Sequence, residues 1–480
     1  MDFEPVIGLE IHAQLLTQTK IFCGCSAKFG AAPNTHVCPV CLGLPGALPV
    51  LNERAVELAV RAAAALSCTI QPRSVFARKN YFYPDLPKGY QISQYEEPLA
   101  VDGLVEYESG GQSYAVRIIR VHLEEDAGKS VHEGLPESDR TTHLDFNRSG
   151  VPLIEIVTHP DIRSSAAAAD FFSRLRAVLR AVAVNDGNME EGSLRCDANV
   201  SMRPVGEARL GVKVEVKNIN SFRFLQRALE YEFERQTEVL RGGGTVAQET
   251  RLWDTAAACT LPMRSKEEAH DYRYFPEPDL PTLEVSEEWV ESIRSALPEL
   301  PEQRKRRLVE QYGLPEQDAG WLSQTAALAR YFEETAQASG NAKAASNWVM
   351  GSVRRYLNEQ QIGIDALGVA PADLAALVTL VDGGAISGSV AKTVFERMVV
   401  SGQAPAVIVE SEGLAQIDDA DVLGDAVRAA IEEHPDAVAS YRGGKTGTLG
   451  FLVGQVMRQT RGKANPQRVS ALLKEALDEN

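Results

Sequence analysis

The sequence has 480 residues, a length that predicts two to four domains with ample capacity for core formation. Hydrophobic residues make up 44% and charged residues 24%, which is ordinary for a globular protein and argues against wholesale disorder or a fibrous repeat. With 49 basic and 66 acidic residues, the formal net charge is −17, which argues against indiscriminate binding to nucleic acid but allows a local basic patch.

The N-terminus predicts a cytoplasmic protein that begins with a strand. Residues 1–5 lack the basic and apolar regions of a signal peptide, and no apolar run approaches the ~20 residues that span a bilayer. We therefore expect no contact with a membrane. Residues 6–15 alternate apolar and polar side chains, which predicts a half-buried strand with Glu10 and His12 on its polar face.

Four of the seven cysteines follow within a short segment. Cys23, Cys25, Cys38 and Cys41 have the spacing C-x-C-x12-C-x2-C, which can close a tetrahedron around zinc, with His36 as a possible substitute ligand. Four protein ligands leave no open position, so such a zinc would be structural. Reduced, unliganded thiols are the alternative.

Alternating and helical patterns then continue to about residue 290. Residues 194–202 and 212–217 alternate like the first strand, and each predicts a strand with one polar face. Helical periodicity marks three segments: 52–66, 165–184 and 221–240, the last with Ser221 as its N-cap. The pattern favours an α+β fold, in which an antiparallel sheet has a helical layer on one side and an open face on the other.

Three further segments could carry chemistry. Residues 79–91 crowd aromatic, proline and lysine residues together, which could stack a base and place ammonium groups on phosphates, or form a packed aromatic loop. Residues 120–126 and 189–193 are rich in carboxylates, which with Glu10 and His12 could hold Mg²⁺ beside a nucleotide phosphate. Each acidic pair alone also fits ordinary solvated surface.

The residue composition changes to a helix-forming pattern after a proline-rich segment that ends near residue 301. We expect a first domain over 1–292, a helical domain over 293–405 and a small helical tail domain over 406–480. In the tail, residues 408–440 carry nine acidic and one basic side chain, whereas 441–480 carry seven basic and three acidic ones. The basic half could bind the phosphates of a nucleic acid, or the two halves could simply balance each other's charge.

Sequence motifs of several enzyme classes are absent. Gly443-Gly444-Lys445-Thr446 is no P-loop, because Ala439 stands where that motif needs its first glycine. We find no Rossmann fingerprint, no G-x-S-x-G elbow, and no Ser-Ser-Lys or N-terminal cysteine arrangement of the kind that hydrolyses amides. If the reaction uses ammonia from glutamine, another chain must release it.

Five segments resemble the B subunits of tRNA-dependent amidotransferases: Val6–His12, Arg78–Asp85, His122–Lys129, Met189–Asn199 and Gly450–Gln455. The resemblance implies a cradle-like catalytic domain, a helical domain and a tail domain. The cysteine spacing places a zinc knuckle at 23–41 in the first of these, and the basic half of the tail then predicts binding to tRNA. It also implies that ATP phosphorylates the side-chain carboxylate of Asp-tRNA(Asn) or Glu-tRNA(Gln). Ammonia from a glutaminase (amidase) A subunit then displaces the phosphate, and a small C subunit completes a heterotrimer.

The resemblance also suggests site residues. We expect the catalytic residues to be Glu10, His12, Glu124 and Glu125, with Glu190 and Glu191 as second choices. Mg²⁺ would be held by Glu10, His12 and Glu125, and ATP or the developing phosphate would contact Lys79, Ser193 and Lys217. The zinc ligands would be Cys23, Cys25, Cys38 and Cys41; some members of the family have lost this cluster, so activity does not require zinc.

Two other functions compete with this one. A non-catalytic scaffold could use the polar strand faces only to grip the acceptor stem of tRNA, and ATP-dependent phosphate release would separate it from an enzyme. An aminoacyl-tRNA synthetase with a zinc knuckle is the second alternative, but the H-x-G-H and K-M-S-K-S signatures of its commonest class are absent.

Overall fold

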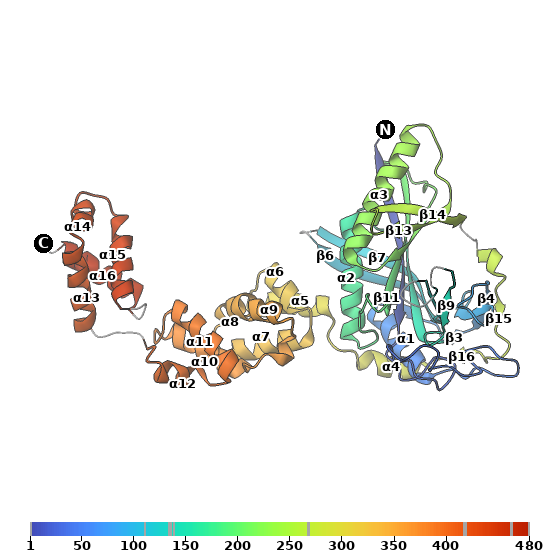
Figure 1. Ribbon diagram of the computed structural model, residues 1–480, viewed down its shortest axis with the longest axis horizontal. Coiled ribbons are helices and arrows are strands. Elements are labelled where there is room, and N and C mark those ends of the chain that lie inside the picture. Colours follow the sequence, from blue (N-terminus) through green and yellow to red (C-terminus); the bar gives the residue numbers. More distant parts are fainter. Residues whose placement is uncertain are drawn as a thin grey trace. The chain divides into compact units, whose positions relative to one another are not determined.

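A nine-stranded sheet forms the centre of the N-terminal unit, Met1–Leu300, in the computed structural model (Figure 1). The structure describes residues 2–109, 112–132, 137, 140–265, 269–415, 420–460 and 464–478. In spatial order the strands are β14 (Cys259–Ser265), β13 (Glu249–Asp254), β12 (Val214–Ile219), β11 (Leu194–Pro204), β1 (Phe3–Gln14), β10 (Pro152–Thr158), β7 (Gln112–Glu125), β6 (Ala100–Ser109) and β2 (Thr69–Ile70). The predicted antiparallel sheet is confirmed, with one exception: strands β12 and β13 run parallel to each other.

One face of this sheet carries the hydrophobic core. Ile7, Leu9 and Ile11 of β1 are at most 1% exposed and pack with Phe171 and Phe172 of the helical layer. That layer consists of α1 (Glu53–Ala65), α2 (Ser165–Ala181) and α3 (Phe222–Arg241). Each fully buried Leu, Ile or Phe stabilises the fold by about 1.5–3 kcal/mol relative to an exposed position. The helices therefore cover this face, and the polar side chains of the strands lie on the other.

The three helices begin where the capping residues predict. Asn52, Ser164 and Ser221 each accept a hydrogen bond from a backbone N–H of the first helical turn. The second helix ends at Ala181, earlier than the apolar pattern predicts, because Ala183 adopts a left-handed backbone with φ of 53°. The predicted helices are thus confirmed apart from their ends.

Small sheets and short helices complete the N-terminal unit. They are β15 (Phe275–Pro276), β4 (Phe76–Asn80) and β5 (Tyr90–Gln94) in one sheet, β16 (Leu283–Glu284) with β3 (Arg73–Ser74), β8 (Lys129–Val131) with β9 (His143–Asp145), the 3₁₀ helix η1 (Ala269–Tyr272) and α4 (Glu287–Ser295). Strand β5 packs against β7, and Figure 1 shows β4 and β15 on the side away from α2 and α3. The small sheet thus borders the polar face.

The second unit, Pro301–Asn480, is helical where it is described. Its elements are α5 (Pro301–Tyr312), α6 (Glu316–Leu322), α7 (Ala326–Ser339), α8 (Ala342–Trp348), η2 (Val349–Val353), α9 (Arg354–Gln360), η3 (Ile364–Ala366), α10 (Pro371–Asp382), α11 (Gly388–Ser401), α12 (Pro405–Ser411), α13 (Ala420–Glu433), α14 (Pro435–Arg442), α15 (Thr448–Gln459) and α16 (Pro466–Asp478). Among the described residues, no helix is long and apolar enough to cross a bilayer.

Three hydrophobic cores run along the chain. Ile293 of α4 lies in the N-terminal core, Ile408 of α12 lies in a second core built from α5 to α12, and Leu423 of α13 lies in a third core with α14 to α16. The α+β fold followed by helical regions is confirmed. The domain limits after residues 292 and 405 stay predictions.

Candidate active site

Four polar side chains form a row across the large sheet. His12 of β1 stands opposite Arg195 of β11 and Glu155 of β10, and Glu155 stands opposite His122 of β7. Directly opposed side chains of antiparallel strands point to the same face. The strand pairing therefore gathers residues that are distant in the sequence on the face opposite the helical layer.

His12, Glu124 and Glu155 form the centre of this site. The Nε2 atom of His12 lies 3.5 Å from Oε2 of Glu155 and 3.8 Å from Oε1 of Glu124. His122 Nε2 lies 3.4 Å from Glu155 Oε2, and Ser93 Oγ donates a hydrogen bond of 3.1 Å to Glu124. One ligand atom from each of the three central residues lies within 4.8 Å of the others, close enough to share a metal ion. We refer to these three residues as the His12 cluster.

Burial and charge act in opposite directions in the His12 cluster. Burial alone would lower the pKa of His12, but the hydrogen bond and charge of Glu155 raise it above its usual value. Burial would raise the pKa of Glu155, but His122 and His12 hold it well below its usual range. The mutual attraction therefore favours ionised carboxylates and protonated imidazoles over their neutral forms. A divalent cation could take the place of the imidazole protons, because it would also bind the ionised carboxylates.

Lys79 of β4 faces the cluster from the small sheet. Its ammonium lies 4.9 Å from the ring centroid of Tyr272 and 5.9 Å from that of Tyr81. Burial would lower the pKa of Lys79, but Tyr274 and the carboxylates of the cluster raise it. Lys79 is therefore a charged ammonium close to the two buried carboxylates, where it could contact an anionic substrate.

Glu10 lies on the same polar face, within a second network. Its Oε1 accepts a hydrogen bond of 2.8 Å from Nδ2 of Asn199, and it stands opposite Asp197 in the sheet. Lys217 of β12 donates to Asp197 at 2.6 Å and lies 3.2 Å from Glu215. The structure thus brings Glu10 and Lys217 to one stretch of this face, beside the His12 cluster.

The four cysteines of the knuckle converge as their spacing predicts. One sulfur from each of Cys23, Cys25, Cys38 and Cys41 lies within 4.8 Å of the others, and all four are free thiols. The backbone N–H of Cys38 donates to the sulfur of Cys41 at 3.2 Å, and a hydrogen bond from Cys23 lowers the pKa of Cys41 to about 4. Such a set of thiols fits a zinc ion. His36 lies outside this group of ligands.

Comparison with known proteins identifies the family of this chain. Residues 5–291 match the family described as the GatB/GatE catalytic domain, and residues 330–477 match the family described as the GatB domain. The B subunit of the aspartyl/glutamyl-tRNA(Asn/Gln) amidotransferase from Pelodictyon phaeoclathratiforme is 53% identical over 478 residues, which cover 100% of both chains. The chain belongs to this family of amidotransferase B subunits. Relatives with the same name from Thermoanaerobacter sp. and Caldanaerobacter subterraneus are 54% and 55% identical over 477 residues, which are 99% of this chain and 100% of each relative.

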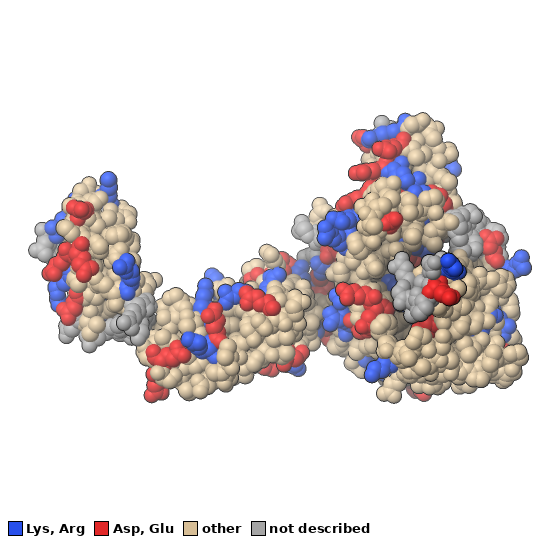
Figure 2. Space-filling view, viewed as in Figure 1, with Lys and Arg blue, Asp and Glu red and all other residues tan. Residues whose placement is uncertain are grey.

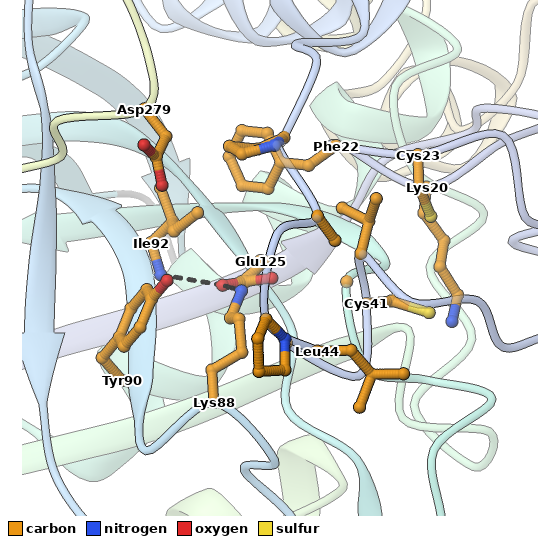
Figure 3. Close-up of a pocket in the computed structure, with 16 residues that line it drawn as sticks. Lys20, Phe22, Cys23, Cys41, Leu44, Lys88, Tyr90, Ile92, Glu125 and Asp279 are labelled. Atoms are coloured by element: carbon orange, nitrogen blue, oxygen red, sulfur yellow. Dashed lines mark hydrogen bonds and ion pairs between the residues drawn. The ribbon is translucent and has the colours of Figure 1, made fainter.

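Glu125, expected as a Mg²⁺ ligand of this amidotransferase chain, makes its contacts away from the His12 cluster. Its Oε1 accepts a hydrogen bond of 2.8 Å from the backbone N–H of Ile92 and forms an ion pair with Lys88. Glu125, Lys88 and Cys41 line a cavity of about 200 Å³. Figure 3 shows the Lys88 and Glu125 side chains next to each other in it. Consecutive residues of a strand point to opposite faces, so Glu124 and Glu125 serve different places. The expected trio of Glu10, His12 and Glu125 is therefore not brought together.

The loop before β11 holds the remaining expected residues. The hydroxyl of Ser193 donates to the backbone carbonyl of Asn188 at 2.8 Å and also contacts Asp186, so it is engaged within its own loop. Glu190 and Glu191 are exposed in the same loop. Glu190 and Glu191 lie outside both groups of described residues that could hold a metal ion.

Three important residues escaped the sequence analysis. Glu155 is the one charged residue of strand β10, which is buried along its whole length. A lone carboxylate in an apolar run is the sequence feature that could have pointed to a functional role. His122 lies in the carboxylate-rich segment 120–126, where the sequence pattern points to the glutamates and not to the histidine. Arg195 donates to Asp126 at 2.9 Å, and its buried Nε has no hydrogen-bond partner, which leaves one donor for a ligand.

Proposed function

We propose that this chain activates the side-chain carboxylate of aspartate or glutamate esterified to tRNA(Asn) or tRNA(Gln), so that ammonia can convert it to the amide. The observation that carries the proposal is the His12 cluster on the polar face of the large sheet, in a chain of the amidotransferase B-subunit family. The enzyme is then a ligase of protein biosynthesis that forms a C–N bond, with glutamine as the nitrogen donor.

The chemistry requires ATP, because a carboxylate is too poor an electrophile for ammonia. A carboxylate oxygen attacks the γ-phosphorus of ATP and ADP leaves; ammonia then attacks the acyl carbon and inorganic phosphate leaves. Phosphoryl transfer depends mainly on positioning and on neutralising charge. We assign charge neutralisation to Mg²⁺ held by His12, Glu124 and Glu155, with Glu10 beside it, and this set replaces the one that includes Glu125.

The cations on the same face would hold the anionic groups of the substrates. Lys79 lies close enough to the carboxylates of the cluster to interact with their charge, Arg195 has a free buried donor, and Lys217 forms an ion pair with Asp197. Each ammonium or guanidinium can hydrogen-bond phosphate oxygens, and Arg can do so through two parallel bonds. We assign them to the triphosphate of ATP and to the phosphate that develops on the amino acid. Ser193 stays a weaker candidate because its hydroxyl already has two partners.

The other parts of the chain would support this reaction. Zinc bound by the four knuckle thiols would be structural, since no ligand position stays open. The basic segment 441–480 would contact tRNA phosphates; Arg461 and Lys463 of that segment lie outside the described residues. We further propose that the chain works in the cytoplasm, in a heterotrimer with a glutaminase A subunit and a small C subunit.

Amide formation by the purified complex tests the proposal. The complex is incubated with Asp-tRNA(Asn) or Glu-tRNA(Gln), glutamine and ATP. We expect amidated tRNA and one phosphate released per amide, both dependent on ATP and Mg²⁺. Binding of charged tRNA without ATP-dependent phosphate release would instead identify a non-catalytic scaffold.

A further inference from the structure

Asp126 is a buried carboxylate that comes directly after Glu124 and Glu125 and that neither step of the proposed reaction uses. Charged side chains of both signs are spread over the visible surface of the N-terminal unit, where water solvates them (Figure 2). The Asp126 side chain, in contrast, is only 4% exposed. An ionised carboxylate is stable in such a place only if charged or hydrogen-bonding groups replace the water.

Four groups surround the Asp126 carboxylate. Its Oδ2 accepts hydrogen bonds of 2.8 Å from Nε2 of Gln14 and 2.9 Å from Nη2 of Arg195. Its Oδ1 accepts one of 3.0 Å from the backbone N–H of Ala127 and lies 3.7 Å from Nε of Arg148. Burial would raise the pKa of Asp126, but the charges of Arg148 and Arg195 hold it below its usual value. The carboxylate is therefore ionised at neutral pH.

Backbone hydrogen bonds fix the position of Asp126, just after the end of β7. Its N–H donates to the carbonyl of Val151 at 2.8 Å, and its carbonyl accepts a hydrogen bond of 2.9 Å from the N–H of Gly150. Arg148 is attached to the same segment, since its Nε donates to the carbonyl of Ala127 at 2.9 Å. The carboxylate is therefore a rigid anchor for the longer side chain of Arg195.

Only part of the Arg195 guanidinium is occupied by Asp126. Its Nη2 donates to the carboxylate, whereas its Nε has no hydrogen-bond partner among the described residues. A carboxylate that accepted from Nε and Nη2 together would block an edge with which arginine binds phosphate. The Arg195 side chain is 34% exposed and stands opposite His12 in the sheet. Asp126 thus holds Arg195 beside the His12 cluster and leaves donors for a ligand.

We propose that Asp126 is a positioning residue: it holds the guanidinium of Arg195 in the orientation in which its remaining N–H groups face a phosphate of ATP or of the activated amino acid. The inference rests on the proposed function, which assigns Arg195 to these phosphates. Asp126 itself contacts neither the substrates nor the metal ion. Because phosphoryl transfer depends on placement, a shift of about 1 Å in such a group can lower the rate about 10²-fold.

Asp126 keeps partners of its own when Arg195 is removed. Gln14 lies two residues after His12, on the same face of β1, and donates to Oδ2 of Asp126. Arg148 supplies a second positive charge beside Oδ1. A variant without Arg195 therefore leaves the carboxylate hydrogen-bonded and close to an opposite charge, so the two residues can be tested separately.

A double-mutant cycle in the whole complex tests the proposal. The variants are Asp126→Asn, which removes the charge but keeps the size, Arg195→Ala, and the two combined. Asp161→Asn is the matched control, because Asp161 also pairs with an arginine of the same unit, Arg117, at 2.7 Å. We measure phosphate release with ATP and charged tRNA, the affinity for ATP in the presence of Mg²⁺, and Mn²⁺ binding by electron paramagnetic resonance.

Asp126→Asn should release phosphate about 10–100-fold more slowly, while its Mn²⁺ affinity and the rate of the control stay near wild type. The double variant should be no slower than Arg195→Ala, because a residue that acts only through Arg195 has no effect once Arg195 is gone. Losses that add overturn the inference. So does a wild-type rate in either single variant, or a loss of Mn²⁺ affinity in Asp126→Asn that parallels its loss of rate.

The affinities for ATP separate this inference from the proposed function. A wild-type complex that binds ATP but releases no phosphate contradicts the proposed function. The same cycle, read in ATP affinity, then decides whether Asp126 acts through Arg195. A wild-type complex that binds no ATP overturns both.

A second measurement covers an Asp126→Asn variant that fails to fold. Guanidinium chloride is added at millimolar concentration to the Arg195→Ala complex, in which Asp126 is intact. The free guanidinium ion should bind to Asp126 and restore part of the lost rate of phosphate release, whereas sodium chloride at the same concentration should not. A rate that guanidinium does not restore, or that both salts restore equally, overturns the inference.

Discussion

His12 of β1 and Glu155 of β10 stand directly opposite each other in the large sheet, with Nε2 of the histidine 3.5 Å from Oε2 of the carboxylate. Glu124 and His122 of β7 complete the surroundings of this pair. Strands β1 and β7 lie on the two sides of β10 and place their polar groups around Glu155. This residue is the one carboxylate in the otherwise apolar run of β10. Such an arrangement suits a bound cation.

Replacing Glu155 should remove a metal ligand. In Glu155→Gln we expect Mg²⁺ affinity to fall at least about tenfold and phosphorylation of charged tRNA to fall by about 10²–10³, because charge neutralisation in the transition state is lost. Mn²⁺ binding followed by electron paramagnetic resonance, together with phosphate release, measures both effects. Glu125→Gln is the matched control, and its affinity for the metal should stay near wild type. Equal losses of metal affinity in the two variants would contradict the assignment.

The knuckle should hold one zinc ion per chain. Loss of a thiol in Cys41→Ser should remove zinc and lower the unfolding midpoint, since metal binding to preformed thiolates adds to folding stability. Metal analysis and thermal unfolding check this, with Cys259→Ser, outside the cluster, as the control. The phosphorylation step should survive in refolded, zinc-poor protein. Protein purified without chelator that contains no zinc would refute the prediction.

Glu232 should make stability depend on pH. This fully buried carboxylate of α3 accepts hydrogen bonds from Arg235 at 2.9 Å and Thr260 at 2.6 Å, and lies 3.2 Å from Arg251. Burial would raise the pKa of Glu232, but hydrogen bonds from Arg235, Gln236 and Thr260 and the charge of Arg235 hold it below its usual value. Its contribution is therefore full above the unfolded-state pKa of about 4.3 and is lost as the pH falls through the native pKa.

We accordingly expect Glu232→Gln to lower the free energy of unfolding at pH 7 by about 1–3 kcal/mol, because Arg235 and Arg251 lose one charged partner while Glu249 stays in place. The difference from wild type should begin to shrink below about pH 4.3, where the unfolded-state carboxylate takes up a proton, and should vanish as the pH falls through the lowered native pKa of Glu232. Denaturant unfolding at several pH values measures it, with the exposed Glu234→Gln as control. A difference that is independent of pH would show that packing, and not charge, is responsible.

Removing the tail should weaken the binding of charged tRNA. The truncation is best made after residue 415, because Ile408 and Val409 of α12 belong to the preceding hydrophobic core. We expect a higher KM for charged tRNA and a flatter dependence of affinity on salt, by about 0.7–0.9 in the logarithmic slope per lost phosphate contact. Glutamine hydrolysis by the partner amidase should continue. A truncated complex with the KM and salt slope of the full chain would count against this role of the tail.

Much of this protein was predictable from local patterns. The alternation in residues 6–15 places Glu10 and His12 on a polar strand face, the capping serine at Ser221 marks the start of α3, and the cysteine spacing predicts the convergence of four thiols. Each of these features depends on residues that are near neighbours in the chain. Strand pleat, helix capping and knuckle turns have short periods, so the sequence alone determines them.

Only the tertiary structure decided which carboxylates share a site. Glu124 and Glu125 look equivalent in the sequence. Because of the pleat of β7, however, Glu124 lies beside His12 and Glu125 lies beside Lys88. Glu155 and Arg195 reach His12 through the register of β10 and β11, which depends on packing across the whole sheet. A shift of one residue in that register would exchange the two faces of a strand, and no local pattern in this chain records the pairing.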